Sequence, residues 1–69
     1  MYRFLIVIEK AGNNYSAYSP DIPGCVATGA TPKEAEERMH QAIVLHIEGL
    51  IEDGLPIPES HSRATFVAV

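Results

Sequence analysis

The chain has 69 residues and a formal net charge of −4, because nine Asp and Glu residues outnumber five Lys and Arg residues. This length allows one domain. Affinity for nucleic acid comes largely from concentrated basic residues, so the acidic composition argues against direct DNA binding. The negative charge suits a basic protein partner instead. The single cysteine excludes an internal disulfide, and no apolar run approaches the length of a membrane span. We therefore expect one cytoplasmic domain over residues 1–69, with no secretory leader.

The chain begins with the pattern of three short strands. Residues 2–9 are rich in β-branched and aromatic side chains, and residues 15–19 follow a turn of Gly and Asn, which predicts a hairpin. Two prolines then interrupt strand pairing over residues 20–24. Residues 25–28 are predicted as a short third strand, which Gly29 ends.

Alternation along the first strand separates two faces. Phe4, Ile6 and Ile8 form a wholly apolar face, which we expect to meet the helix that follows. Leu5 and Val7 point the other way, so we expect them on the uncovered face of the sheet, where they can support self-association.

A long helix is predicted for residues 31–53. Thr31 and Glu34 fit a capping box, in which the Thr31 hydroxyl accepts a hydrogen bond from the Glu34 N–H and the Glu34 carboxylate reaches back to the N–H of Thr31. Gly54 can take the left-handed conformation that ends a helix, and Pro56 prevents its continuation.

The helix has a core face and a second apolar stripe. At 100° per residue, the residues expected to face the sheet are Ala35, Met39, Ala42, Ile43, His46, Gly49 and Leu50. Val44, Ile47 and Ile51 lie well round from the centre of that face and widen the apolar arc beyond what a small sheet covers. We therefore expect these three residues to join a self-association surface of a homo-oligomer, either a dimer or a tetramer.

The end of the chain is predicted to return to the sheet. Residues 55–63 form a proline-containing connection, and residues 64–69 alternate enough to predict a closing strand. The predicted order is β-β-β-α-β. Strands joined by tight turns and followed by one covering helix favour an α+β two-layer sandwich with a mainly antiparallel sheet.

The histidines do not predict a metal site. His40 and His46 are six residues apart on the predicted helix, whereas joint ligation from one helix uses spacings of three or four. His61 lies in a loop with no obvious ligand beside it. We expect no metal and no cofactor, and we expect His46 to pack in the core or against a partner.

Catalysis has little support in the sequence. Cys25 has no neighbouring cation or histidine that would activate its thiol, so we expect a small buried cysteine. The carboxylates of Glu9, Asp21, Glu48 and Asp53 could make a metal-dependent nuclease site only by converging in a pocket. Glu48 and Asp53 lie on different sides of the predicted helix, which favours solvated acidic surface. We do not expect an enzyme.

Two motifs resemble a known family. The chain is similar to the HicB family of antitoxins, also called the UPF0150 type, in the segment Pro20-Asp21-Ile22-Pro23-Gly24-Cys25 and in Gly29-x-Thr31-x-x-Glu34-Ala35. Residues 42–43, 46–50, 53–54 and 57–58 continue the similarity in order, so it covers nearly the whole chain. The resemblance implies a partial, catalytically empty ribonuclease-H-like fold.

The same resemblance implies a partner. HicB proteins neutralise HicA, a small basic toxin that cleaves mRNA, by covering its active site. Many members also carry a C-terminal DNA-binding domain, which we do not expect here, so the chain is expected to be a toxin-binding module. The alternatives are a small oligomeric binding domain with no toxin partner and a carboxylate-dependent nuclease. Partner contacts are expected at the rigid proline turn and at the acidic positions of the helix: Asp21, Ile22, Glu37, Glu48 and Glu52.

Overall fold

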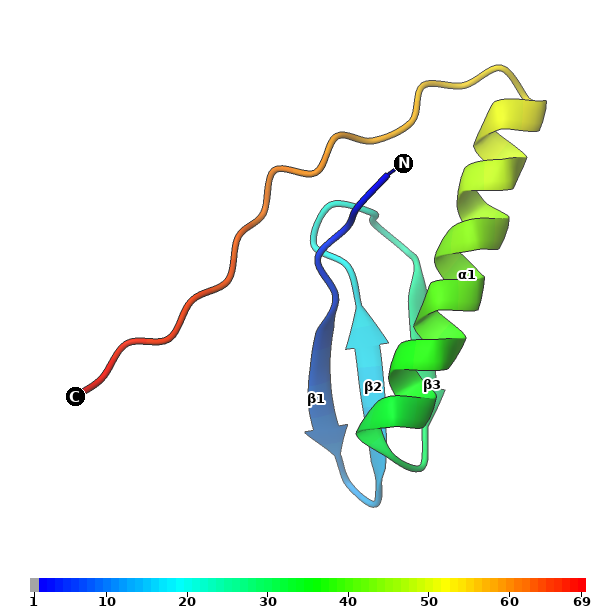
Figure 1. The fold of residues 1–69 in the computed structure, drawn as a ribbon. Helices are drawn as coiled ribbons and strands as arrows, with labels where there is room; N and C mark the ends of the chain where they lie inside the picture. The colour runs from blue at the N-terminus through cyan, green and yellow to red at the C-terminus, as the bar shows by residue number, and fades with distance from the viewer. Residues whose placement is uncertain (1) are drawn as a thin grey trace.

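The computed structural model describes residues 2–69 and shows an α+β fold of two layers (Figure 1). Three strands, β1 (Val7–Ala11), β2 (Asn14–Tyr18) and β3 (Val26–Gly29), form an antiparallel sheet in the order β1-β2-β3. The helix α1 (Pro32–Glu52) follows and packs on one face of this sheet. The predicted α+β class, with its antiparallel sheet and one long helix, is confirmed.

The β1–β2 hairpin is tight because its loop has only two residues. Ala11 pairs with Asn14, which leaves Gly12 and Asn13 to reverse the chain. Gly12 has a φ of 64°, a value that a two-residue hairpin loop needs at its first position and that glycine adopts without steric cost. The predicted hairpin is therefore confirmed.

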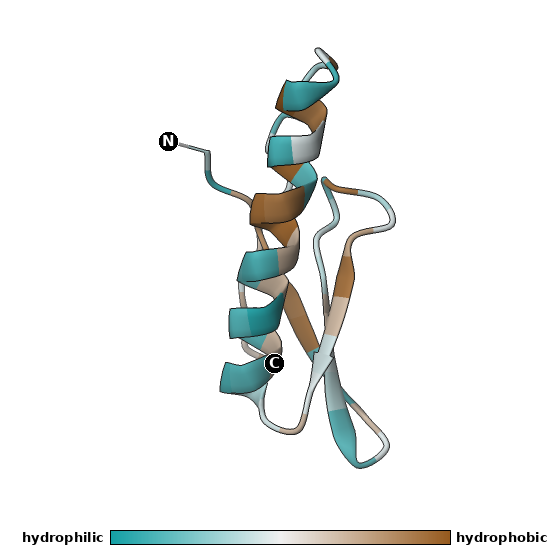
Figure 2. Ribbon diagram, turned by 90° about the vertical axis from the view of Figure 1, so that its right-hand side faces the viewer, coloured by the Kyte–Doolittle hydropathy of each residue, from teal (hydrophilic) through white to brown (hydrophobic). Residues whose placement is uncertain are grey.

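The face of the sheet that meets α1 forms the core. Ile8, Ala17 and Ala27 lie opposite one another across the three strands. Phe4 and Ile6 join Ile8 in packing half-buried against the core, as the alternation predicts. Figure 2 shows hydrophobic residues at the N-terminal ends of β1 and β3 and in the middle of α1. The buried residues of the core are Ala17, Ile22, Cys25, Ala35 and Met39.

Both ends of α1 are capped as the sequence predicts. Thr31 is extended, with a φ of −132°, and its hydroxyl accepts a hydrogen bond of 3.1 Å from the Glu34 N–H. The Glu34 carboxylate reaches back 3.0 Å to the N–H of Ala30, one residue before the expected partner. At the other end Asp53 is the C-cap, and Gly54 follows with a φ of 68°.

The first strand is shorter than predicted. Residues 2–6 are extended but belong to no strand, and β1 begins at Val7, which pairs with Tyr18. Two residues after Tyr18 comes Pro20, which has no N–H to donate, and the chain turns there as the Ile22 N–H bonds the Ser19 carbonyl at 3.2 Å. Residues 2–6 therefore have no β2 residue to pair with, because β2 ends at Tyr18.

The predicted closing strand at residues 64–69 is wrong. Within the described part of the chain, no strand follows α1, and the C-terminal segment crosses the end of the sheet and then runs away from it (Figure 1). Asp21 accepts hydrogen bonds from the Ser62 N–H at 3.1 Å and from the Ser62 hydroxyl at 2.9 Å. These bonds tether the connection to the β2–β3 turn, and the residues beyond Ser62 leave the body from that point.

The second half of α1 extends beyond the strands. A helix of 21 residues is about 31 Å long, whereas a strand of five residues spans only about 17 Å. His46 is consequently exposed, although its helical position is on the core side. It does not pack in the core, and the alternative that it contacts a partner stays a prediction. Ile47 is buried instead, at 9% exposure, and it lines an open hollow together with Tyr2 and Phe4 of the N-terminal segment.

Candidate partner-binding site

The outward side of α1 combines carboxylates with apolar side chains. Glu37, Glu48 and Glu52 are all exposed, and the helical repeat places them within about 60° of arc. The same repeat places Val44 and Leu45 on the two sides of this arc, and these two side chains are 44% and 70% exposed. We call these five residues the acidic helix face. Such a surface offers negative potential together with apolar area that a partner can bury.

The self-association residues expected on the helix separate in the structure. Val44 and Ile51 are exposed, at 44% and 59%, and remain available to a partner. Ile47 is only 9% exposed and offers a partner little surface in a single copy.

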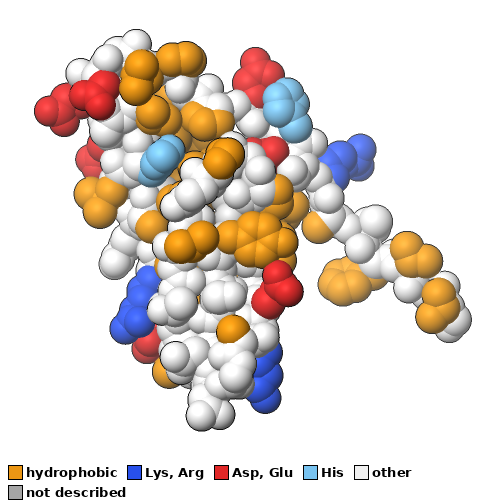
Figure 3. All heavy atoms as spheres, turned by 180° about the vertical axis from the view of Figure 1, so that it is seen from behind, with side chains coloured by type: hydrophobic (Ala, Val, Ile, Leu, Met, Phe, Trp, Pro, Cys, Tyr) orange, Lys and Arg blue, Asp and Glu red, His pale blue; other side chains and the backbone are white. Residues whose placement is uncertain are grey.

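A second apolar surface lies on the sheet face turned away from α1. Val7, Tyr18 and Val26 are directly opposite one another on the three strands, and Tyr18 and Val26 are 39% and 67% exposed. Leu5 and Val7 are half-buried. Figure 3, which views the molecule from this side, shows hydrophobic side chains over the middle of the face with charged groups around them.

The proline turn has a structural role. Ile22 is only 1% exposed and belongs to the core, so it does not present its side chain to a partner as expected. Asp21 is committed to Ser62, and the hydrogen bond from the Ser62 N–H is the main reason that the pKa of Asp21 is lowered. Burial opposes that shift, and the Ser62 hydroxyl adds to it. The Asp21–Ser62 contact joins residues 41 positions apart, and no local sequence signal indicates it.

The groups considered for catalysis lie apart. Glu9 is on β1, Asp21 is in the β2–β3 turn, and Glu48 is on the outward side of α1. Within residues 2–69, no group of three His, Cys, Asp or Glu side chains could hold a metal ion. Cys25 is buried, and burial raises the pKa of its thiol, which disfavours the reactive thiolate.

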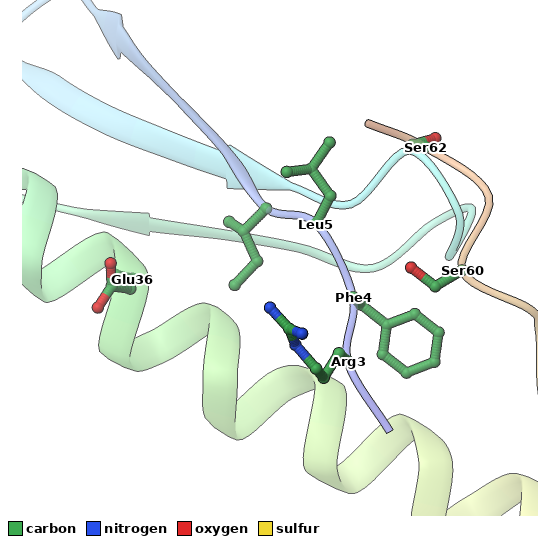
Figure 4. Close-up of a pocket in the computed structure, with 7 residues that line it drawn as sticks. Arg3, Phe4, Leu5, Glu36, Ser60 and Ser62 are labelled. Atoms are coloured by element: carbon green, nitrogen blue, oxygen red, sulfur yellow. The ribbon is translucent and has the colours of Figure 1, made fainter. Parts of the chain in front are cut away.

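An open hollow of about 460 Å³ lies where the two terminal segments approach one another. Figure 4 shows Arg3, Phe4 and Leu5 of the N-terminal segment beside Ser60 and Ser62 of the C-terminal segment, with Glu36 contributed by α1. The hollow is wide and joins polar and apolar groups without a nucleophile held against a base. Among residues 2–69, no helix is both long enough and apolar enough to cross a membrane.

Comparison with known proteins identifies a family. A family model described as the HicB-like antitoxin of bacterial toxin–antitoxin systems matches residues 4–68. A UPF0150 protein of Synechocystis is 35% identical over 60 residues, which are 86% of this chain and 76% of that protein. A UPF0150 protein of Helicobacter pylori is 41% identical over 49 residues, which cover 71% of this chain and 68% of that protein.

A phage protein is also similar. An uncharacterized 14.9 kDa protein from the rep-hol intergenic region of Haemophilus phage HP1 is 43% identical over 62 residues. The match covers 90% of this chain but only 47% of the phage protein, so the chain spans about half the length of that relative. No solved structure matches the chain.

Proposed function

This chain belongs to the HicB-like antitoxin family of bacterial toxin–antitoxin systems, and we propose that it binds and neutralises a small basic HicA-like toxin. The family match over residues 4–68 is the observation that carries the proposal. In this role the protein covers the active site of a toxin that cleaves mRNA, and it acts in the cytoplasm, where mRNA is found. Its action is binding, without turnover of a substrate.

The acidic helix face supports this proposal. A toxin that holds RNA needs basic residues around its active site, because phosphates are bound mainly by Lys and Arg. Glu37, Glu48 and Glu52 offer exposed carboxylates of the opposite sign, which steer a basic partner and set its orientation. Val44 and Leu45 add apolar area beside them, and burial of such area in the centre of an interface supplies much of its affinity.

Co-expression with a neighbouring small basic protein tests the proposal. Cells that induce the neighbour alone should stop growing, and cells that also express this chain should recover. The two purified proteins should elute together from a size-exclusion column. A neighbour that neither binds this chain nor is silenced by it would contradict the proposal.

The catalytic alternative has its own assay. Purified protein incubated with RNA should leave the RNA intact. RNA cleavage that disappears on Glu48→Gln or Asp21→Asn substitution would favour the carboxylate-dependent nuclease instead.

A further inference from the structure

We propose that residues 65–69 form a strand that pairs with the free edge of β1 in a second copy of this protein. We call residues 65–69 the donor segment and the outer edge of β1, with residues 2–6 beside it, the acceptor edge. The inference goes beyond toxin binding, since it concerns contacts between copies of this chain alone. It rests on the exposure of the donor segment, the bare acceptor edge and the tether between Asp21 and Ser62.

The donor segment is apolar and unprotected. Phe66, Val67 and Val69 are 101%, 80% and 123% exposed, so their side chains contact water almost completely. Aromatic and β-branched residues of this kind favour strands, where they pack on a pleated surface. Burial of these side chains in an interface would be favourable, because it removes apolar area from water. The donor segment would therefore bury apolar surface by joining a sheet.

The acceptor edge lacks a neighbour. β1 is at one end of the β1-β2-β3 order, so the backbone groups on its outer side have no ladder partner within the described chain. Phe4 and Ile6 beside it are only half-buried, and together with Tyr2 and Ile43 they line an open groove between the N-terminal segment and α1. A bare edge next to half-buried apolar groups invites strand addition.

The dimensions of the two elements match. The donor segment has five residues, which span about 17 Å when extended, and β1 also has five residues. A single added strand could thus cover the whole of β1.

The tether indicates that the acceptor is another copy. The Ser62 N–H and hydroxyl bond the Asp21 carboxylate, which fixes the point where the segment leaves the body. From there the chain runs outward beyond β1 and away from its own sheet (Figure 1). Because every copy carries both a donor and an acceptor, two copies related by a two-fold axis satisfy both edges and both segments in one closed contact. An unrelated protein that took the donor segment would leave the acceptor edge bare.

Substitution in the donor segment tests the inference. The unsubstituted protein should sediment with twice the chain mass of 7.5 kDa at high micromolar concentration. Val67→Asp should convert it to a monomer that keeps the helical circular dichroism signal of α1, because Val67 is 80% exposed and lies outside the core. A matched control is Leu45→Asp, which places the same charge at a similarly exposed apolar site on α1 and should leave the dimer intact.

Three sedimentation results would overturn the inference. They are a monomeric unsubstituted protein, a Val67→Asp variant that remains dimeric, and a Leu45→Asp variant that dissociates. The last result would place self-association on the helix.

Disulfide trapping separates exchange between copies from folding back within one copy. Glu9→Cys on β1 is combined with either Phe66→Cys or Val67→Cys, since successive residues of a strand face opposite sides and one of the two shares a face with residue 9. Cys25 stays in place because it is buried. Oxidation should give a covalent dimer in one combination, with the single-cysteine variants as controls. A monomer with an internal disulfide, or free thiols in both combinations, would overturn the inference.

Discussion

Gly29 shows how one residue fixes the contact between the two layers. A Cβ atom at this position would lie 2.5 Å from the Ala35 nitrogen and 2.9 Å from its Cα. These atoms belong to the helix backbone and cannot move aside as a flexible side chain would. The absence of a side chain at the end of β3 therefore lets α1 approach the sheet closely.

Gly29→Ala should lower the free energy of unfolding by about 1–3 kcal/mol or more, because it overpacks a rigid contact. Gly49→Ala is the matched control, since a Cβ there meets nothing within 4 Å, and it should raise the free energy of unfolding by about 0.5–1 kcal/mol through better helix propensity. Urea denaturation of both variants measures the difference. Equal effects of the two substitutions would show that the close approach at Gly29 does not matter.

Asp21 makes the tether pH-dependent. Its pKa is lowered in the folded protein, chiefly by the hydrogen bond from the Ser62 N–H, so the contribution of this contact is fully present above the ordinary Asp pKa of about 3.9. It is lost as the pH falls through the lowered pKa. The Ser62 amide should exchange its hydrogen slowly at neutral pH and faster in acid, relative to its intrinsic rate. In Asp21→Asn, NMR should show faster exchange at neutral pH and a smaller dependence on acid. A Ser62 amide that exchanges equally in both proteins would contradict the tether.

The helix α1 is held to the sheet at its first turns. Arg38 donates a hydrogen bond of 3.1 Å to the Thr28 carbonyl and also lies 3.2 Å from the Glu34 carboxylate, which in turn bonds the Ala30 N–H. The N-terminal cap and the strand before it thus share one set of polar contacts. Loss of the cap should affect the whole small domain, because the same turn carries the buried Ala35 and Met39.

Thr31→Ala should reduce the free energy of unfolding by about 1 kcal/mol, because the Glu34 N–H loses its acceptor. Thr31→Ser keeps the hydroxyl and should remain within a few tenths of the original value. Thermal unfolding followed by circular dichroism compares the two. An unchanged midpoint for Thr31→Ala would mean that the cap contributes nothing here.

The helix and the hairpin could be predicted because their signals are local in the sequence. The course of the C-terminal segment and the burial of single side chains could not, because they depend on tertiary contacts. The capping residues Thr31 and Glu34, and the hairpin Gly12, act through neighbours in the chain, so α1 and the β1–β2 turn could be predicted from sequence. The closing strand could not, because the tether of Ser62 to Asp21 depends on a contact across 41 positions. The exposure of His46 likewise depends on how far the sheet extends beneath the helix, which periodicity does not reveal.

For the molecule as a whole, the distribution of charge decides how it meets a basic partner. The carboxylates of the acidic helix face were predicted as contacts from the sequence, and the structure places Glu37, Glu48 and Glu52 on one exposed side. Ile22 belongs to the core instead, because the turn that carries it folds inward beneath α1. The exposure of these acidic residues was therefore easier to predict than the burial of Ile22.

Glu48→Lys should slow association with a basic toxin more than Glu59→Lys does, although both change the net charge equally. Glu59 is exposed on the C-terminal segment, away from the acidic helix face. Combined reversal at positions 37, 48 and 52 should lower the association rate constant about tenfold or more at low ionic strength, and added salt should reduce the difference. Stopped-flow mixing gives these rates. Identical rates and salt slopes for Glu48→Lys and Glu59→Lys would contradict steering by this face.

The buried Cys25 gives the molecule a built-in probe of its own opening. Its thiol is the one sulfhydryl in the sequence, it is 7% exposed, and burial raises its pKa, so a thiol-reactive dye in solution meets an inaccessible, protonated group. Labelling must then wait for fluctuations that separate α1 from the sheet. With excess dye, the labelling rate of the natural sequence reports how often the domain opens locally. A bound partner that suppresses this opening would protect the Cys25 thiol from the dye without contacting it.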